Sequence, residues 1–522
     1  MPDTPEVIDI SPARAVECLT AGRFVEAEHI IDRLLVGQPQ SPTSWTLAAK
    51  VRQAKGDFAG MVSAAKSARD LSKAGLNEAF LYCEALIFSG QFQLLRDELA
   101  LLEETIALAD TRALSKLSEF YTHCGAFEDA ERLADRALAT APHDAGLLFN
   151  RAAARIAIGR HDEAEGDLDM VIKRQPRDYD AYYNRATLRK QTQDNNHITE
   201  LRELRRLVSP CPPALGYALA KELEDLGRWT ESFAALEEGA RARRAMLPYR
   251  VETDLEAMAQ IANTFGAERL SGVKEAASDT GPIFVLGLPR TGTTLIDRIL
   301  SSHADISSVG EVDDMPLSLT AATMGASDKG DRIRRAASID MEGLGTQYWR
   351  RLQGRINANT IVDKTPSNFL YIGLIALAMP TAKIVHVQRH PIAAGYAIYK
   401  TLFRMGYPYS YDLTDLGRYI AGYQRLMDHW RKALPGRLIE VAYEDLVTEP
   451  EQTVRTLLSA CHMQWDEGCM AFYANAAPSA TASAAQVRQP IHTASVDLWR
   501  QYETQLQPLR DAIIQECGDP KW

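Results

Sequence analysis

A glycine-bearing turn between a buried strand and a helix is the segment of this chain best suited to hold phosphate. The apolar run 283–286 is typical of a buried strand, and apolar residues recur with helical spacing from Leu295 onward. In the turn between them, backbone N–H groups and the positive end of the helix would converge on an anion. The hydroxyls of Thr291, Thr293 and Thr294 would add further donors.

This turn has the glycine spacing of a nucleotide-binding P-loop but lacks the lysine of that motif. Gly287 and Gly292 keep the spacing, while Thr293 stands where a P-loop has lysine. The cation in the turn is Arg290, whose guanidinium can pair with phosphate oxygens. The turn therefore predicts a phosphate site that is not built for ATP.

Strand-like runs end in polar turns at further places in the second half of the chain. They lead into Asp363-Lys-Thr-Pro366, Arg389-His-Pro391 and Tyr443-Glu-Asp-Leu446. Helical stretches separate the runs, which predicts parallel βα units and a three-layer α/β domain. Because ligands of such sheets bind beyond the carboxyl ends of the strands, we expect all these turns to face one site.

The Pro-Arg-Thr-Gly-Thr-Thr turn resembles the 5′-phosphosulfate loop of sulfotransferases that use 3′-phosphoadenosine-5′-phosphosulfate (PAPS). It is similar above all to the loop of tyrosylprotein sulfotransferases and of bacterial sulfotransferases that carry tetratricopeptide repeats. The resemblance covers essentially the whole chain and implies PAPS as sulfuryl donor, with no metal. It also implies that five residues of the turn bind the donor: Arg290, Thr291, Gly292, Thr293 and Thr294.

The resemblance also implies the catalytic groups. Lys364 matches a lysine that lies against the sulfonate, where it would stabilise the charge that develops as the S–O bond breaks, together with Arg290. A surface lysine at a strand end is the alternative. Glu311 matches a Gly-Glu-Glu segment and would take the proton of the acceptor hydroxyl. The register leaves Glu311 and Val312 open, and we choose Glu311 because valine cannot accept a proton.

Arg389 opens a segment that resembles the 3′-phosphate site of the family. Where the family has a serine on the following helix this chain has Ala397, and Ala393 replaces a frequent aspartate. Arginine suits phosphate through its fixed fork of donors, so we expect Arg389 to keep most of the contact. The missing hydroxyl puts the selectivity for the 3′-phosphate in question.

A late segment, Gln486-Val-Arg-Gln-Pro-Ile491, resembles a loop that closes over the nucleotide. The resemblance implies contacts from Gln486 and Val487 and a second 3′-phosphate cation at Arg488. The Ala- and Ser-rich stretch 476–485 before it suits a lid or a plain linker. Tyr443 matches a tyrosine near the adenine or the 3′ side, although a core tyrosine is an equal interpretation.

The first half of the chain is a repeat array. Glycines recur about every 34 residues, which is the period of tetratricopeptide repeats. Small residues precede the glycines and mostly aromatic residues follow them in the same phase. Gln193 interrupts the series and predicts an irregular sixth repeat. The turn glycines of the series are Gly22, Gly56, Gly90, Gly125, Gly159 and Gly227.

Composition limits the classes of protein that this chain can belong to. A net charge of −11 argues against a nucleic-acid binder, which would show a basic face. The first residues have neither the basic nor the apolar region of a signal peptide, so we expect none. The longest apolar stretch, near 370–379, is too short to span a bilayer. Seven scattered cysteines without a Cys-x-x-Cys pair favour reduced thiols in the cytoplasm.

Together these patterns predict an α plus α/β protein in three parts. Residues 1–236 form a tetratricopeptide superhelix, 237–280 a helical connector and linker, and 281–522 a P-loop-like sulfotransferase domain with a parallel sheet. The acceptor hydroxyl is left open among protein tyrosine, glycan and small molecule, and the repeat groove could hold a peptide or protein or make a homodimer. The alternatives are a repeat scaffold with a weakened nucleotide site and, less favoured, a P-loop kinase.

Overall fold

The computed structural model describes residues 9–73, 75–107, 110–273, 280–404, 406–479, 481 and 486–518. The predicted linker before residue 280 and the predicted lid at 476–485 fall partly outside these residues. Among the described residues, no helix is both long and apolar enough to cross a membrane.

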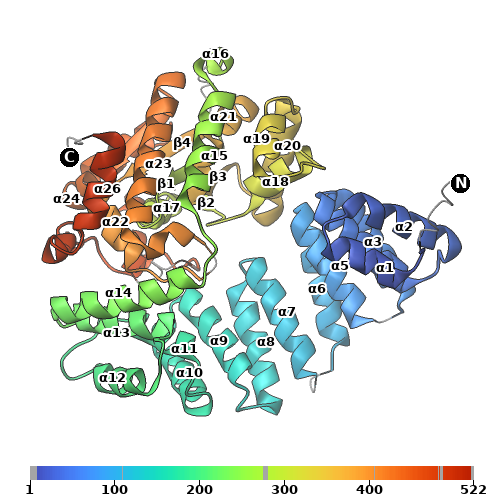
Figure 1. The fold of residues 1–522 in the computed structure, drawn as a ribbon, viewed down its shortest axis with the longest axis horizontal. Helices are drawn as coiled ribbons and strands as arrows, with labels where there is room; N and C mark the ends of the chain where they lie inside the picture. The colour runs from blue at the N-terminus through green and yellow to red at the C-terminus, as the bar shows by residue number, and fades with distance from the viewer. Residues whose placement is uncertain are drawn as a thin grey trace, which may run out of the picture. The chain divides into compact units, whose positions relative to one another are not determined.

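Within the described residues, the first half forms successive pairs of helices (Figure 1). Each pair has the two-helix form that the 34-residue period predicts. The pairs are α1 (Pro12–Thr20) and α2 (Phe24–Gly37), α3 (Pro42–Lys55) and α4 (Phe58–Leu71), α5 (Leu76–Ser89) and α6 (Phe92–Thr105), α7 (Thr111–His123) and α8 (Phe127–Thr140), α9 (Ala145–Ile158) and α10 (His161–Arg174), α11 (Tyr179–Thr187) and α12 (Ile198–Leu207), and α13 (Pro213–Asp225) and α14 (Trp229–Ala245).

The backbone conformation and burial in the repeats agree with the predicted positions of glycines and small residues. All six predicted turn glycines have φ between 71° and 86°, a left-handed conformation that glycine adopts without strain. The small residues expected where paired helices meet are buried, from Ala15 in the first pair to Ala220 in the last. In the sixth pair, α11 ends at Thr187 and α12 begins only at Ile198. The predicted irregular repeat is thus confirmed.

The second half contains a parallel sheet in the order β2-β3-β1-β4-β5. The sheet places β1 at its centre, with Phe284 in register with Asp363 of β3 and Ile384 of β4. The carboxyl ends of the strands therefore meet at one edge of the sheet, as predicted. The strands are β1 (Gly281–Gly287), β2 (Ser307–Ser308), β3 (Thr360–Asp363), β4 (Lys383–Gln388) and β5 (Leu438–Ala442).

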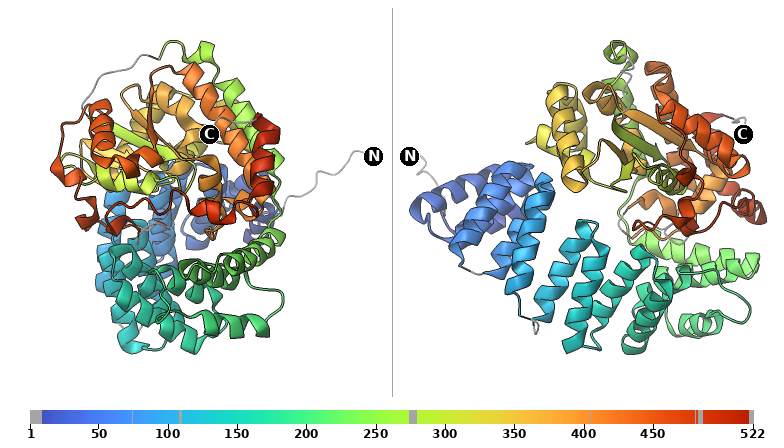
Figure 2. Two further views of the ribbon diagram at one scale, coloured as in Figure 1. Left: turned by 90° about the vertical axis from the view of Figure 1, so that its left-hand side faces the viewer. Right: turned by 180° about the vertical axis from the view of Figure 1, so that it is seen from behind.

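Helices cover both faces of this sheet (Figure 2). On one face, α17 (Thr293–Leu300) and α25 (Pro450–Ala460) share a core with Val285 and Val385. On the other face lie the 3₁₀ turn η1 (Pro366–Tyr371) and α23 (Leu413–Ala433), where buried Trp430 donates to the carbonyl of Phe369 at 3.0 Å. The predicted three-layer α/β fold after a helical repeat array is confirmed.

The remaining elements connect or extend these layers. They are α15 (Val251–Thr264), α16 (Ala267–Leu270), α18 (Asp314–Ala322), α19 (Lys329–Ala336), α20 (Met341–Arg355), α21 (Ile372–Ala378), α22 (Pro391–Tyr399), η2 (Pro408–Tyr411), α24 (Tyr443–Thr448), η3 (Glu467–Cys469), η4 (Phe472–Ala474), η5 (Gln486–Arg488), η6 (Leu498–Tyr502) and α26 (Gln507–Cys517).

The chain forms two compact units that do not follow the order of the sequence. One unit joins residues 1–107 to 313–355, and the other joins 108–312 to 356–522. In the first, Arg351 of α20 donates to the carbonyl of Phe88 at 2.9 Å and pairs with the buried carboxylate of Asp314 at 2.6 Å. In the second, the later repeats belong to the same unit as the sheet. Helices inserted between β2 and β3 thus pack on the early repeats.

Candidate active site

The predicted phosphate turn is an open loop between β1 and α17. Arg290 has φ 65° and Gly292 has φ 103°, so the loop runs through left-handed conformations. A Cβ atom on Gly292 would lie 2.6 Å from the ring of Tyr443, and one on Gly287 would lie 2.5 Å from the carbonyl oxygen of Val387. Both glycines are therefore required by close approach of the strands and turns beside β1.

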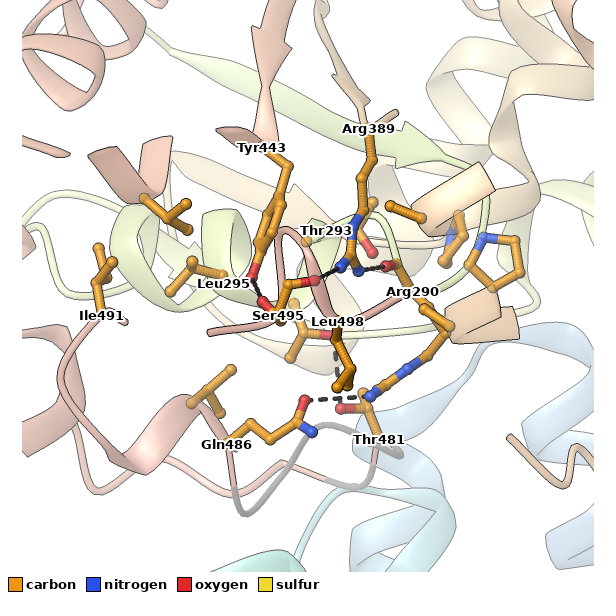
Figure 3. A pocket seen from close by; sticks show the side chains of 18 of the residues that line it. Arg290, Thr293, Leu295, Arg389, Tyr443, Thr481, Gln486, Ile491, Ser495 and Leu498 are labelled. Atoms are coloured by element: carbon orange, nitrogen blue, oxygen red, sulfur yellow. Dashed lines mark hydrogen bonds between the residues drawn. The ribbon is translucent and has the colours of Figure 1, made fainter. Parts of the chain in front are cut away.

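A cavity of about 280 Å³ lies against this loop (Figure 3). Its lining comes from the segments that follow β1, β4 and β5 and from the late segment that begins at Gln486. The predicted site residues that line it are Arg290, Gly292, Thr293, Thr294, Glu311, Arg389, Tyr443, Gln486 and Val487. Three predicted residues are not among its described lining residues: Thr291, Lys364 and Arg488.

The guanidinium of Arg290 lies over the loop and reaches the late segment. Its Nη2 donates to Oε1 of Gln486 at 3.1 Å (Figure 3). Burial lowers the pKa of Arg290, and the nearby guanidinium of Arg389 acts in the same direction. Two guanidinium groups this close together create a positive potential, which favours the binding of an anion beside them.

Arg389 lies on the wall of the cavity beside Tyr443. It donates to the carbonyl oxygens of Arg290 at 3.0 Å and Ser495 at 2.6 Å, and its guanidinium carbon lies 4.6 Å from the centre of the Tyr443 ring. The hydroxyl of Tyr443 lies 2.6 Å from Oγ of Ser495. Burial lowers the pKa of Arg389, and its buried Nε has no hydrogen-bond partner within the described residues. Arg389 and Tyr443 thus lie side by side at the cavity.

The three threonines of the loop have different surroundings. Thr291 is buried and its hydroxyl donates to the carbonyl of Leu288 at 2.8 Å, so this side chain shapes the loop from within. Thr293 and Thr294 line the cavity at the first turn of α17. The Thr294 hydroxyl lies 3.5 Å from that of Thr481, a residue of the stretch before the late segment.

The two predicted catalytic groups meet in an ion pair. Lys364, directly after β3, is fully buried, and its ammonium pairs with the carboxylate of Glu311. Glu311 is 45% exposed at its side chain and lines the cavity, whereas Val312 is buried in the fold. The carboxylate therefore stands between the buried cation and the cavity.

A further carboxylate, Asp297 of α17, belongs to this cluster. Its Oδ1 accepts a hydrogen bond from the hydroxyl of Ser308. Burial raises the pKa of Asp297, although the charge of Lys364 and the bond from Ser308 act to lower it. Sequence analysis missed Asp297 because a polar residue on an amphipathic helix usually faces solvent.

Asp363, which could imitate the carboxylate of a nucleotide hydrolase, serves the fold. It is fully buried, and its Oδ2 accepts a hydrogen bond from the side-chain amide of Asn368 at 3.0 Å. This bond closes the turn between β3 and η1. Among the described residues, no group of His, Cys, Asp and Glu side chains is arranged to hold a metal ion.

Arg488 points to the repeat array instead of the cavity. Its Nη2 donates to the carbonyl of Ala157 in α9 at 3.1 Å, and its guanidinium packs on the turn at Gly159. The amide of Ser479 donates to the same carbonyl at 2.8 Å. The late segment and the stretch before it thus both contact the fifth repeat, a contact between distant segments that no local pattern encodes.

Part of the cavity lining comes from α22 and the segment after it. Arg389, Ala393 and Ala397 line the cavity in succession, as helical spacing from Arg389 predicts. Aromatic residues, whose site role sequence analysis missed because they look like ordinary core residues, complete this wall. The additional lining residues include Tyr396, Lys400, Phe403, Tyr407, Ser495 and Trp499.

Comparison with known proteins finds a family for part of the chain. Residues 282–467 match the family model described as "Sulfotransferase family". This part of the chain is therefore a sulfotransferase-family domain, and the predicted resemblance is confirmed. It follows an array of tetratricopeptide-type helix pairs.

Curated relatives are distant. An uncharacterized protein of Aquifex aeolicus is 28% identical over 394 residues, which are 72% of this chain and 51% of the relative. Protein-tyrosine sulfotransferase 1 of Danio rerio is 24% identical over 204 residues, which are 36% of this chain and 55% of the relative. The chain thus spans about half the length of these two relatives.

Solved structures are similar to each half of the chain. The sulfotransferase domain of the Synechococcus PCC 7002 olefin synthase is 22% identical with a TM-score of 0.32, covering 44% of this chain and 90% of that domain. A tetratricopeptide repeat protein of Parabacteroides merdae is 15% identical with a TM-score of 0.32, covering 46% of this chain and 93% of that protein.

Proposed function

We propose that this protein is a PAPS-dependent sulfotransferase that moves a sulfuryl group to a hydroxyl acceptor. The loop amides, Arg290, Thr293 and Thr294 would hold the 5′-phosphosulfate. Arg389 would hold the 3′-phosphate, with Tyr443 beside it. Arg488 contacts the repeats, so we assign it the anchoring of the late segment instead of a phosphate contact.

The residues present suit such a donor. Two arginines, loop amides and two hydroxyls converge on one cavity, and all of them stabilise anions. The buried Nε of Arg389 has no hydrogen-bond partner within the described residues, and a buried donor without one is costly. A phosphate oxygen would satisfy it.

Lys364 and Glu311 would carry the chemical step. As the acceptor oxygen bonds to sulfur and the S–O bond to the 5′-phosphate breaks, negative charge grows on the leaving oxygen. Lys364 and Arg290 would stabilise that charge, and Glu311 would take the proton of the acceptor hydroxyl. The observation that carries this proposal is the Glu311–Lys364 pair beside the same cavity as the Arg290 loop.

The test is transfer of labelled sulfate from PAPS to a panel of tyrosine peptides, phenols, glycans and cell extract. We expect transfer by the wild type and its loss in Glu311→Gln, with Asp445→Asn, an exposed carboxylate of the same domain, as control. Magnesium-dependent turnover of ATP without sulfate transfer would favour the kinase alternative, against which Thr293 and the position of Asp363 argue. PAPS binding without transfer to any acceptor would favour the scaffold alternative.

We further propose that the early repeats hold the acceptor or a second copy of the chain. Support comes from the fold, because such arrays bind peptides in their grooves. In the later repeats, the carbonyl of Ala157 is already contacted by Arg488 of the chain itself. A cytoplasmic location stays a prediction.

A further inference from the structure

One wall of the cavity lacks the hydroxyl that the resemblance leads us to expect. Ala397 lines the cavity in register with Arg389, yet its methyl group offers no hydrogen bond. Lys400 follows at helical spacing and lines the same cavity. A cation therefore stands about one turn beyond the alanine, on the side of the helix that faces the cavity.

The ammonium of Lys400 has a counter-ion from the repeat array. Its Nζ lies 2.5 Å from Oε1 of Glu224, a residue of α13. The side chains of Lys400 and Glu224 are 28% and 13% exposed, so the pair is largely withdrawn from water. An ammonium carries three donors, and Lys400 gives one of them to Glu224.

Glu224 does not depend on Lys400 alone. Its Oε2 also accepts hydrogen bonds from the hydroxyls of Tyr396 and Tyr502, the latter at 3.2 Å. Although burial acts to raise it, the Lys400 ammonium and these bonds lower the pKa of Glu224 below its ordinary value. If Lys400 turned toward an anion in the cavity, the carboxylate would keep two hydroxyl donors.

We propose that Lys400 is a specificity-determining residue for the 3′-phosphate of the donor, and that Glu224 of the repeat array competes with this phosphate for its ammonium. The inference rests on the proposed function. A phosphate carries more charge and more acceptor oxygens than a carboxylate, so it can outcompete Glu224 at close range. A nucleotide without a 3′-phosphate has no group that could bind the Lys400 ammonium, so the ion pair between Lys400 and Glu224 stays intact. The seventh repeat is then part of the nucleotide site.

The experiment is calorimetric titration of the full chain with 3′-phosphoadenosine-5′-phosphate (PAP) and with AMP, which lacks the 3′-phosphate. Lys400→Met is expected to weaken PAP by about tenfold or more and to leave AMP unchanged, because one charge-assisted contact is lost. Lys400→Arg is expected to restore most of the preference for PAP. Lys432→Met removes an exposed lysine of α23 in the same domain and serves as the charge control.

Glu224→Gln is expected to change the affinity for PAP in the opposite direction. Removing the competing charge is expected to tighten PAP severalfold without changing AMP, whereas Glu237→Gln, an exposed carboxylate on α14, should change neither. Circular dichroism identifies a variant that fails to fold, and the Lys400→Met and Lys400→Arg titrations then decide alone. An unchanged PAP-to-AMP ratio in Lys400→Met would overturn this inference and leave the proposed function standing. A wild type that binds neither nucleotide would overturn both.

Discussion

The carboxylate of Glu311 and the buried ammonium of Lys364 form an ion pair although 53 positions separate them in the chain. The pair gives a fully buried cation its counter-charge and brings that counter-charge to the cavity wall. Both residues follow or flank strands that end at the same edge of the sheet. Their meeting there is the strongest single reason to interpret this edge as a site of chemistry.

Loss of Lys364 should lower turnover more than donor binding. In Lys364→Met we expect kcat to fall by a factor equivalent to about 2–4 kcal/mol in the barrier, as for one preorganised donor of a charge-stabilising site. The Kd for PAP, from calorimetry, should change little because PAP lacks the transferred group. Lys432→Met is the matched control. An unchanged kcat would remove Lys364 from the mechanism.

Loss of Arg290 should affect binding and turnover together. Its guanidinium would contact phosphate in both the bound and the transition state, so Arg290→Ala should raise the Kd for PAP and lower kcat. Gln486→Ala removes one hydrogen bond of this guanidinium and a cavity-lining amide, and we expect a smaller rise in Kd without the fall in kcat. Arg455→Ala, on α25 away from the cavity, controls for lost charge. Equal effects of the Arg290 and Gln486 substitutions would contradict a direct phosphate contact.

The later repeats should be required for donor binding. The segment 399–402 is held by Tyr217, which donates to the carbonyl of Tyr399 at 3.1 Å, and by the hydroxyl of Tyr183, which accepts the amide of Leu402 at 3.2 Å. Residues 281–522 expressed alone should therefore show neither cooperative unfolding nor PAP binding. A chain of 108–312 joined by a flexible linker to 356–522 should retain both, because it keeps one compact unit whole. Tight PAP binding by 281–522 alone would show that the repeats are dispensable for the cavity.

A serine at Ala397 should strengthen the 3′-phosphate contact. Ala397→Ser would add a hydroxyl to the wall that Arg389 and Lys400 share. A well-aligned charge-assisted hydrogen bond contributes about 1.5–3 kcal/mol. Because two cations already share this wall, we expect a smaller gain, with PAP about three- to tenfold tighter and AMP unchanged. Calorimetry with both nucleotides measures it. The same gain for AMP would mean that this wall does not face the 3′-phosphate.

The partly buried carboxyl of Asp297 should make stability depend on pH. Because folding raises its pKa, this group favours the folded state below the pKa of the unfolded chain, and the contribution is lost as pH rises through the folded value. Asp297→Asn should therefore raise Tm at pH 7 by about 2–4 °C and should have little effect near pH 4. Scanning calorimetry at both pH values, with exposed Asp445→Asn as control, checks this. A lower Tm at both pH values would mean that the contacts to Ser308 and Lys364 outweigh burial.

Local patterns in the sequence determined the elements and most of the site. The glycine at every repeat turn, such as Gly56 and Gly159, prescribes a left-handed residue that depends on its neighbours alone. The strand–turn signals placed Arg290 and Arg389 at strand ends, and parallel pairing brings strand ends to one edge whatever the loops do. These predictions rest on short-range chemistry, which a sequence displays directly.

Only the tertiary structure decided which distant surfaces meet. Arg488 donates a hydrogen bond to Ala157 of the repeats, and Glu224 of the repeats forms an ion pair with Lys400 at the cavity wall. Helices inserted between β2 and β3 joined the early repeats, as the contact of Arg351 with Phe88 records. Such contacts join residues that lie 176 to 331 positions apart in the chain. They depend on how whole helices pack. A charged side chain is compatible with solvent or with a partner, and its sequence does not say which until packing brings a partner near.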